Sequence, residues 1–577
     1  MAAAGADGGA AARATIDSTL PPQPLAAAVT AQHLPAGGSM AERIARLELP
    51  QFKESYAKLT DAMGGEAKVE ERLQRTLAAD PGMAALPGPH KVYGLLRAFK
   101  LGQEANLHGD RFLLVQQWLE ELGGKARNIA MPDLTGGWGE GLAPAFWVVL
   151  GNAEDHARVA EQHVRKAPVF QLASYGTHFL AEVDKSEWQR RRFGAIHTVA
   201  TFAIREYCPI MIDYTEKLAG RLRSGKEGTL LYGSAAPAPA FNMHELLADT
   251  AFKIAAKALF NVDGAKLEAW SQKIRWALQR SSRSADAAQK IMSEWAELVQ
   301  SAPAGTAGPL TAALRDLAED FPAPTAANVK AGRIKDKAMR DDVLIVSLAM
   351  HDTTASTMTS CLMELARRPA LQDQVAAECT RVIASCSPRG LNYDDLHRMP
   401  LLTKCLNETL RLWNAVAYGT MRQFDCDTAV KSDGGTVSVK GGTIVMLPNF
   451  SNHRNKALWG ADADEWRPER WEGFADEGSF NFGDEPADLA FSGKNPQSLR
   501  FHPFTRAPRD CFGKNFAQAE MRVVLPVLLS QFRFRLAEPT VSKMGTSPEA
   551  NFFQISGILK PRDGMWMHAE PREQAKL

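Results

Sequence analysis

Apolar residues recur at steps of three and four along most of this chain, which is the spacing of one face of an α-helix. In the middle of the chain the pattern predicts helices over residues 187–205, 241–260, 266–279 and 287–299. A longer helix is predicted from about residue 334 to residue 368, because Pro369 lacks the N–H that a further turn would need. Two more helices are predicted at residues 371–385 and 401–413.

Alternation typical of β-strands occurs only in short stretches, at residues 145–150 and 437–447. Residues 303–324 are rich in alanine and proline and are predicted to form a surface loop. The pattern as a whole predicts a mainly α protein with small β-sheets.

Segments that contain proline and glycine divide the chain into three parts. Residues 1–39 are rich in alanine, glycine and proline and nearly uncharged, so we expect a disordered extension. Residues 40–85 form a helical lead-in segment whose pattern is interrupted at Pro50. Leu86–His90 (LPGPH) begins one large domain that extends to residue 573, because no linker and no internal repeat follow it.

Composition and charge exclude some functions and leave the location open. The formal net charge is +1 and the pI is near 7.7, so no global field attracts nucleic acid. The longest apolar runs, around residues 142–150 and 343–350, are too short to span a bilayer, and no signal peptide is evident. We expect an intracellular protein without a transmembrane anchor: soluble, peripherally attached to a membrane or imported into an organelle.

Seven cysteines are scattered along the chain, at positions 208, 361, 379, 386, 405, 426 and 511. They form no CxxC pair and their number is odd, which is typical of a reducing compartment rather than of a disulfide scaffold or a zinc ribbon. Six of them are expected to fill core space as small hydrophobic residues. The exception is Cys511.

Cys511 stands in the segment Pro503–Gly513 (PFTRAPRDCFG). A Phe, an Arg, the Cys and a Gly at these fixed offsets arise by chance on the order of once in 10⁵ positions. The segment resembles the cysteine loop of cytochromes P-450 of the eukaryotic type. The resemblance implies that Cys511 is the thiolate ligand of a haem iron, that Phe504 shields the sulfur and that Arg509 pairs with a haem propionate. Gly513 would let backbone N–H groups approach the thiolate.

Two other segments resemble the charge cluster of the same family. Glu408-Thr409-Leu410-Arg411 matches its ExxR motif, which alone is a weak signal because about two such pairs arise by chance in a chain of this length. The later segment Trp466–Trp471 (WRPERW) resembles the PERF element, and Arg470 would complete a buried Glu–Arg–Arg cluster. Arg422 follows Glu408 at the distance where the family often has a second propionate partner.

The middle of the long predicted helix carries the segment Ala349–Thr354 (AMHDTT), which resembles the family's oxygen-activating motif. An acid beside an alcohol could deliver protons to the oxygen being reduced, with Thr353 next to that oxygen and Asp352 connected to solvent. The alternative is a polar stretch whose hydroxyls bond back to their own helix. His351 is interpreted as the variable residue of the motif and not as a ligand.

Trp188 and Arg192 lie one helical turn apart and resemble the family's WxxxR motif, which holds a propionate. Arg190 and Arg191 between them are best explained as a basic solvated face. Such a face could also dock an acidic electron donor.

The chain departs from the family pattern at several places. Ala507 replaces a glycine of the cysteine loop and is tolerable if its φ stays negative. Met350 replaces the glycine that loosens the oxygen-binding helix, and its bulk could close part of the distal groove. Asn414-Ala415 replaces the usual proline pair, and the acidic insert Glu472–Asp488 is expected to be a solvated loop.

The resemblance implies a triangular helical domain with a β-rich lobe, a heme b cofactor and a monooxygenase that acts on an apolar substrate with O₂. No flavin or NAD fingerprint accompanies the motifs, so electrons would come from a separate flavoprotein reductase or ferredoxin, with NADPH acting only indirectly. Three alternatives stay open: a peroxide-using or rearranging haem-thiolate enzyme, a haem sensor or carrier without turnover, and a helical interaction protein with fortuitous motifs.

Overall fold

The computed structural model describes residues 38–108, 110–122, 128–135, 143–167, 178–182, 184–225, 239–278, 286–319, 335–472, 500–544, 552–555 and 558–572. Residues 1–37 of the expected extension and residues 473–488 of the acidic insert lie outside this description. Within the described ranges the protein is mainly helical with small sheets, as predicted.

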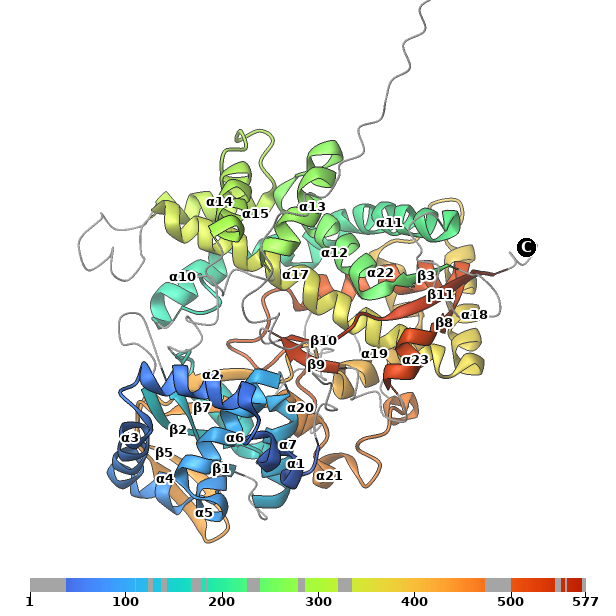
Figure 1. Cartoon of the computed structure of the whole chain (residues 1–577). Coiled ribbons are helices and arrows are strands. Elements are labelled where there is room, and N and C mark those ends of the chain that lie inside the picture. Colours follow the sequence, from blue (N-terminus) through green and yellow to red (C-terminus); the bar gives the residue numbers. More distant parts are fainter. Residues whose placement is uncertain are drawn as a thin grey trace, which may run out of the picture.

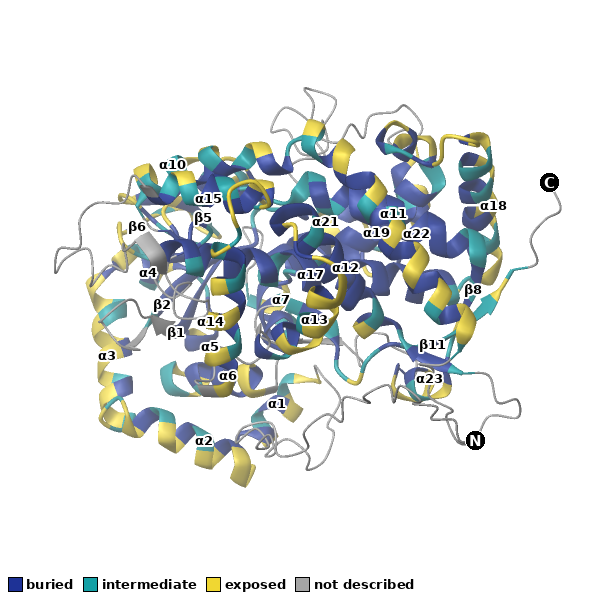
Figure 2. Ribbon diagram, turned by 90° about the horizontal axis from the view of Figure 1, so that it is seen from above, coloured by how far each residue is buried: buried dark blue, intermediate teal, exposed yellow. Residues whose placement is uncertain are grey.

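Three helices form the centre of the larger helical part: α12 (Met243–Phe260), α17 (Lys335–Ala366) and α22 (Lys514–Gln531). In α12 nearly every residue is buried, because neighbouring helices cover it on all sides. Figure 2 shows these helices in dark blue at the middle of the molecule, whereas α2 (Pro50–Asp61) and α3 (Glu66–Ala79) present exposed faces at its edge. The long helix α17 crosses the molecule between the helical part and the sheet-rich part (Figure 1).

The other helices of this part are α10 (Lys185–Ala195), α11 (Thr201–Ser224), α13 (Gly264–Leu278), α14 (Asp286–Gln300), α15 (Pro309–Glu319), α18 (Pro369–Ser385) and α19 (Pro400–Leu412). Most lie within two or three residues of the predicted bounds. The helix predicted over residues 187–205 is instead divided between α10 and α11 by a 3₁₀ turn, Ile196–Val199. The prediction of a loop at residues 303–324 is wrong for α15. Pro309 is the first residue of this helix, and its missing N–H is no loss there because the first N–H groups of a helix have no partner within the helix.

A four-stranded sheet in the order β1-β2-β7-β4 forms the centre of the sheet-rich part. Its strands are β1 (Asn128–Thr135), β2 (Ala143–Leu150), β7 (Ile444–Leu447) and β4 (Thr420–Gln423). β2 and β7 are parallel, and the other two pairs are antiparallel. The single strand predicted at residues 437–447 is two strands in different sheets, because a turn with Gly442 at φ +87° separates β6 (Gly435–Val439) from β7.

Smaller sheets complete the fold. They pair β5 (Thr428–Ser432) with β6, β9 (Phe552–Ile555) with β10 (Ile558–Pro561), and β3 (Ala240–Asn242) with β11 (Trp566–Pro571) and β8 (Phe532–Leu536). Short helices fill the connections: α1 (Met40–Arg46), α4 (Pro81–Ala85), α5 (Pro89–Tyr93), α6 (Leu95–His108), α7 (Arg111–Leu122), α8 (Ala153–Gln162), α20 (Asn449–His453), α21 (Lys456–Trp459) and α23 (Glu538–Met544).

The lead-in segment packs into the core of the sheet-rich part. Arg43 and Arg46 of α1 are buried, and they form ion pairs with Glu104 and Asp110, of which Arg43–Asp110 measures 3.0 Å. Burial, partly offset by Arg46, raises the pKa of Glu104 to about 7. Leu86, the expected start of the large domain, lies in the same apolar cluster as residues on both sides of it in sequence.

Five of the seven cysteines are buried, and all seven are free thiols. The expectation that six fill core space is wrong for Cys426, which is exposed because it stands in the turn between β4 and β5. The remaining exposed cysteine is Cys511.

The described helices include none long and apolar enough to cross a membrane. The longest, α17, carries acidic residues such as Asp341, Asp342 and Asp352 at buried positions. α17 is therefore a long helix of the protein core.

Candidate functional site

Cys511 lies at the end of the loop that leads into α22. Its backbone N–H donates to the carbonyl of Phe504 at 2.9 Å, and solvent reaches its side chain. Surrounding protein atoms raise the pKa of the thiol above its ordinary value, whereas a hydrogen bond with the backbone of Gly513 and the charge of Arg192 act in the opposite direction. The sulfur is thus accessible and adjacent to groups that favour a thiolate.

The backbone of this loop accommodates its two unusual residues differently. Ala507 has a negative φ, the condition under which an alanine is tolerable there. Thr505 has φ +62°, a left-handed conformation that costs a β-branched residue about 1–2 kcal/mol. Its hydroxyl donates to the carbonyl of Arg509 at 3.2 Å. Phe504 is half-buried and packs against the main core.

Two of the three arginines expected to hold propionates, Arg509 and Arg192, lie beside the loop. Arg509 is buried, with its guanidinium carbon 4.4 Å from the centre of the Trp188 ring, and its Nε donates to the carbonyl of Val164 at 2.9 Å. Arg192 donates two hydrogen bonds to Asp510, one to its backbone carbonyl at 2.9 Å and one to Oδ1 at 2.8 Å. The WxxxR helix is thereby attached to the residue that precedes Cys511.

Arg422 of β4 is a fully buried cation with few partners. Its Nη1 donates weakly to the carbonyl of Val164 at 3.3 Å, and no described residue accepts a hydrogen bond from its Nε or Nη2. Burial lowers the pKa of Arg422 to about 9. Next to it lies Lys166, which sequence reasoning missed, and whose pKa is held well below its usual value by burial and by the charges of Arg422 and Arg509.

The buried cations Lys166, Arg422 and Arg509 repel one another, and burial lowers the pKa of each. Asp510 is the principal anion that acts on Arg422. A ligand with two carboxylates would offset this excess of positive charge and satisfy the unpaired nitrogens of Arg422. The residues present therefore fit the propionates of a heme b.

Behind the loop, the structure brings together Glu408, Arg411 and Arg470. Glu408 receives two hydrogen bonds from Arg411, at 2.8 and 2.7 Å, and one from Arg470 at 3.2 Å. Trp471 also donates to this carboxylate at 3.0 Å. The other donors of Arg411 reach backbone carbonyls of residues 453, 463 and 465, so the pair is buried and well satisfied.

The predicted acid–alcohol pair lies on α17. Asp352 is buried, with Oδ2 at 3.1 Å from Lys560 Nζ and Oδ1 at 3.6 Å from His244 Nε2. Burial alone would raise the pKa of Asp352, but the charge of Lys560 and the hydrogen bond with His244 hold it well below its usual range. Thr353 is half-buried, and its hydroxyl donates to the carbonyl of Ala349 at 2.8 Å, which is the back-bonded geometry of the alternative interpretation.

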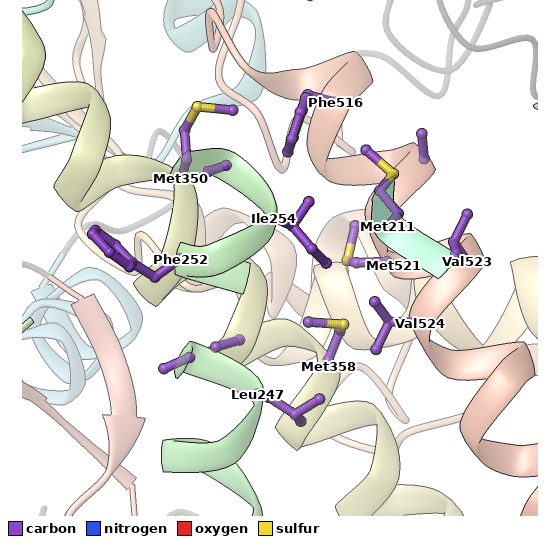
Figure 3. Packing of buried hydrophobic residues seen from close by; sticks show 14 of the residues in the cluster. Met211, Leu247, Phe252, Ile254, Met350, Met358, Phe516, Met521, Val523 and Val524 are labelled. Atoms are coloured by element: carbon purple, nitrogen blue, oxygen red, sulfur yellow. The ribbon is translucent and has the colours of Figure 1, made fainter. Parts of the chain in front are cut away.

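Met350 extends from α17 to the cysteine loop. It is buried, and a Cβ added at Gly513 would lie 4.0 Å from its Cε. Figure 3 shows the side chain pointing toward Phe516, in the first turn of the helix that follows the loop. The neighbouring His351 instead packs its edge against Phe252, 5.7 Å between ring centres. A porphyrin between α17 and Cys511 requires that the flexible Met350 side chain withdraw from the loop.

The basic face expected at Arg190 and Arg191 is wrong for Arg191. This residue is buried and forms ion pairs with Asp342 of α17 and, at 3.7 Å, with Glu182. Arg190 pairs with Glu187 at 2.9 Å and stays partly exposed. Asp342 stands 151 residues from Arg191 in sequence, so no local pattern indicated this pair.

Comparison with known proteins identifies the class to which this fold and site belong. A family model for cytochrome P450 matches residues 269–557, half of the chain. The chain belongs to the cytochrome P450 family.

Individual relatives match a shorter segment. Human cytochrome P450 4F2 is 29% identical over 239 residues, 41% of this chain and 40% of that protein. The human ultra-long-chain fatty acid omega-hydroxylase is 30% identical over 241 residues, 41% of this chain and 39% of the relative. Cytochrome P450 714C3 of Oryza sativa subsp. japonica is 37% identical over 185 residues, 32% of each chain. The chain thus spans two fifths or less of the length of these relatives.

Proposed function

We propose that this protein is a haem-thiolate monooxygenase that inserts one oxygen atom from O₂ into an apolar organic substrate. The observation that carries the proposal is the exposed Cys511 in a loop flanked by buried cations, of which Arg422 has two nitrogens without a partner among the described residues. The iron of one haem would bind the Cys511 thiolate, and the two propionates of the same haem would pair with the buried cations.

Cys511 would hold the iron of heme b, and Arg422, Arg509 and Arg192 would hold its propionates. When bound, a haem ligated by thiolate supplies the electron density that favours cleavage of the O–O bond. Trp188 keeps Arg509 in place by lying beneath its guanidinium. Arg192 orients the loop through Asp510.

On α17, Asp352 would pass protons between solvent and Thr353. Lys560 and His244 keep the Asp352 carboxylate ionised and fixed, so its release from Lys560 would have to precede proton uptake. The Thr353 hydroxyl would exchange its bond to the Ala349 carbonyl for one to the oxygen being reduced. Both groups act by holding or moving a proton.

Electrons would come from a separate flavoprotein reductase or ferredoxin, because the sequence carries no flavin or NAD fingerprint. The name of one relative, a fatty acid omega-hydroxylase, supports long acyl chains as the first substrates to try.

The test is the spectrum of the purified, reduced protein under CO, which should show the red-shifted Soret band of a thiolate–haem complex. Cys511→Ala should abolish this band even where haem is retained. Cys426→Ala is the matched control, because Cys426 is the other exposed cysteine. A band that survives Cys511→Ala would refute the proposed ligand.

A second candidate is a haem-thiolate enzyme that uses or rearranges peroxides. Met350 favours it, because it stands where the oxygen-binding helix of the family usually has a glycine. Turnover sustained by peroxide, with no NADPH-driven turnover under any electron donor, would favour this function over the first.

A further inference from the structure

Met350 is a potential iron ligand on the face of the site opposite Cys511. Its side chain is buried, and its terminal methyl lies beside Gly513, two residues after the cysteine. The thioether sulfur is attached to that methyl, and the side chain points from α17 toward Phe516 at the start of α22 (Figure 3). The Met350 sulfur therefore lies close to the loop that carries the proposed haem ligand Cys511.

The neighbouring donors on α17 point elsewhere. His351 binds the carbonyl of Ser347 through Nδ1 at 2.7 Å and packs against Phe252. Asp352 is held by Lys560, and the Thr353 hydroxyl bonds within its own helix. Met350 is thus the side chain of this motif that the structure brings to the loop.

We propose that, with haem bound, the thioether sulfur of Met350 is the axial ligand opposite Cys511. The inference rests on the proposed haem-thiolate function. Methionine is an established haem ligand in proteins, and its three rotatable bonds let the sulfur withdraw from Gly513 while the backbone of α17 stays in place. The bond is dative, so no redox step or leaving group is involved.

This ligand would control access to the iron. A small molecule such as CO binds only to the fraction of protein in which the thioether has dissociated, and its apparent affinity and binding rate are multiplied by that fraction. If about 1–10% of the molecules are open, binding slows about 10- to 100-fold. Substrate binding that displaces Met350 would then activate the enzyme.

The experiment compares the haem-loaded wild type with Met350→Leu, which keeps most of the side-chain volume but lacks the sulfur. The ferric wild type should be low-spin and show the near-infrared magnetic circular dichroism band of a thioether ligand, a readout that needs no variant. Met350→Leu should lose the band and bind CO about 10- to 100-fold faster by stopped flow. Met350→Gly, which restores the residue usual in the family, should behave like Met350→Leu.

Met358→Leu is the matched control, because Met358 is a buried methionine two turns further along α17. It should retain the band and the slow rate. Equal rates and no thioether band in wild type and Met350→Leu, with the thiolate–CO band present in both, would overturn the inference and leave the proposed function intact. Absence of the thiolate–CO band from the wild type would instead overturn the proposed function, and this inference with it.

Discussion

Replacing Arg422 by methionine should change the stability of the protein in opposite directions with and without haem. Arg422 is fully buried, and neither its Nε nor its Nη2 has a hydrogen-bond partner among the described residues. Burial lowers its pKa from the ordinary value of an arginine to about 9, so the surroundings disfavour the charged form. In the haem-free protein the cation is therefore a source of instability.

The size of the effect follows from the pKa shift. The fall of the Arg422 pKa from the ordinary value of an arginine to about 9 corresponds to a cost of about 5 kcal/mol for keeping the side chain charged. Part of this is recovered by relaxation, and replacement of buried charges by apolar side chains typically stabilises a protein by about 1–4 kcal/mol. We expect Arg422→Met to raise the free energy of unfolding of the haem-free protein by that amount. Loss of a charge-assisted bond to a propionate, about 1.5–3 kcal/mol, should weaken haem binding by about 10- to 100-fold.

The assay is urea denaturation of the haem-free protein together with titration of haem into it. Arg422→Lys, which keeps a charge but not the planar fork, should lie between wild type and Arg422→Met in haem affinity. Arg75→Met, at an exposed position of α3, controls for the removal of a positive charge. A haem-free Arg422→Met protein that is less stable than the wild type, or one that binds haem equally well, would refute the assignment of Arg422 to a propionate.

Three further predictions concern stability. Glu408→Gln leaves the buried Arg411 without its carboxylate, whereas the partly buried Arg470 keeps its ion pair with Asp462. The substitution should lower the free energy of unfolding by about 3–5 kcal/mol in urea denaturation, and a loss below about 1 kcal/mol would contradict the cluster. Thr505→Gly relieves the left-handed strain in the cysteine loop and should stabilise the protein by about 1 kcal/mol, seen as a higher Tm, whereas a lower Tm would show that the hydroxyl contributes more than the strain costs. Burial lowers the pKa of His351 from 6.5 to about 4, so between these pH values the unfolded chain binds a proton that the folded protein does not. The free energy of unfolding should therefore decrease as the pH is lowered from 6.5 to about 4, by up to about 1.4 kcal/mol per pH unit from this residue. His351→Leu should reduce this slope in denaturation measured at a series of pH values. An unchanged slope would contradict the lowered pKa of His351.

The parts of the fold that sequence predicted are those encoded locally. Most helices match their periodic segments because an amphipathic face is written within the helix itself. The loop predicted at residues 303–324 failed for α15 because composition outweighed periodicity, although Pro309 is favourable as the first residue of a helix. The break between α10 and α11 was missed because the apolar spacing continues across the 3₁₀ turn.

The candidate site divides in the same way, by sequence separation. The cysteine loop is contiguous, so its ligand, its flanking arginine and its helix can be predicted together. Lys166 was missed because it acquires its position from Arg422, 256 residues later, through a single β-bridge. Lys560, 208 residues from Asp352, carries no motif at all.

This division explains why the two faces of the site differ in how far they follow the family. On the cysteine side, one short segment supplies both Cys511 and Arg509. The strained backbone of Thr505, with its positive φ, belongs to the same segment. On the α17 side, the proposed function would depend on three side chains: Met350 beside the cysteine loop, the buried carboxylate of Asp352, and Lys560, which pairs with it. Because Met350 and Cys511 belong to different segments, we expect a substitution at Met350 to leave the cysteine loop in place, so that the chemistry of the proposed site could change while the family's cysteine is kept.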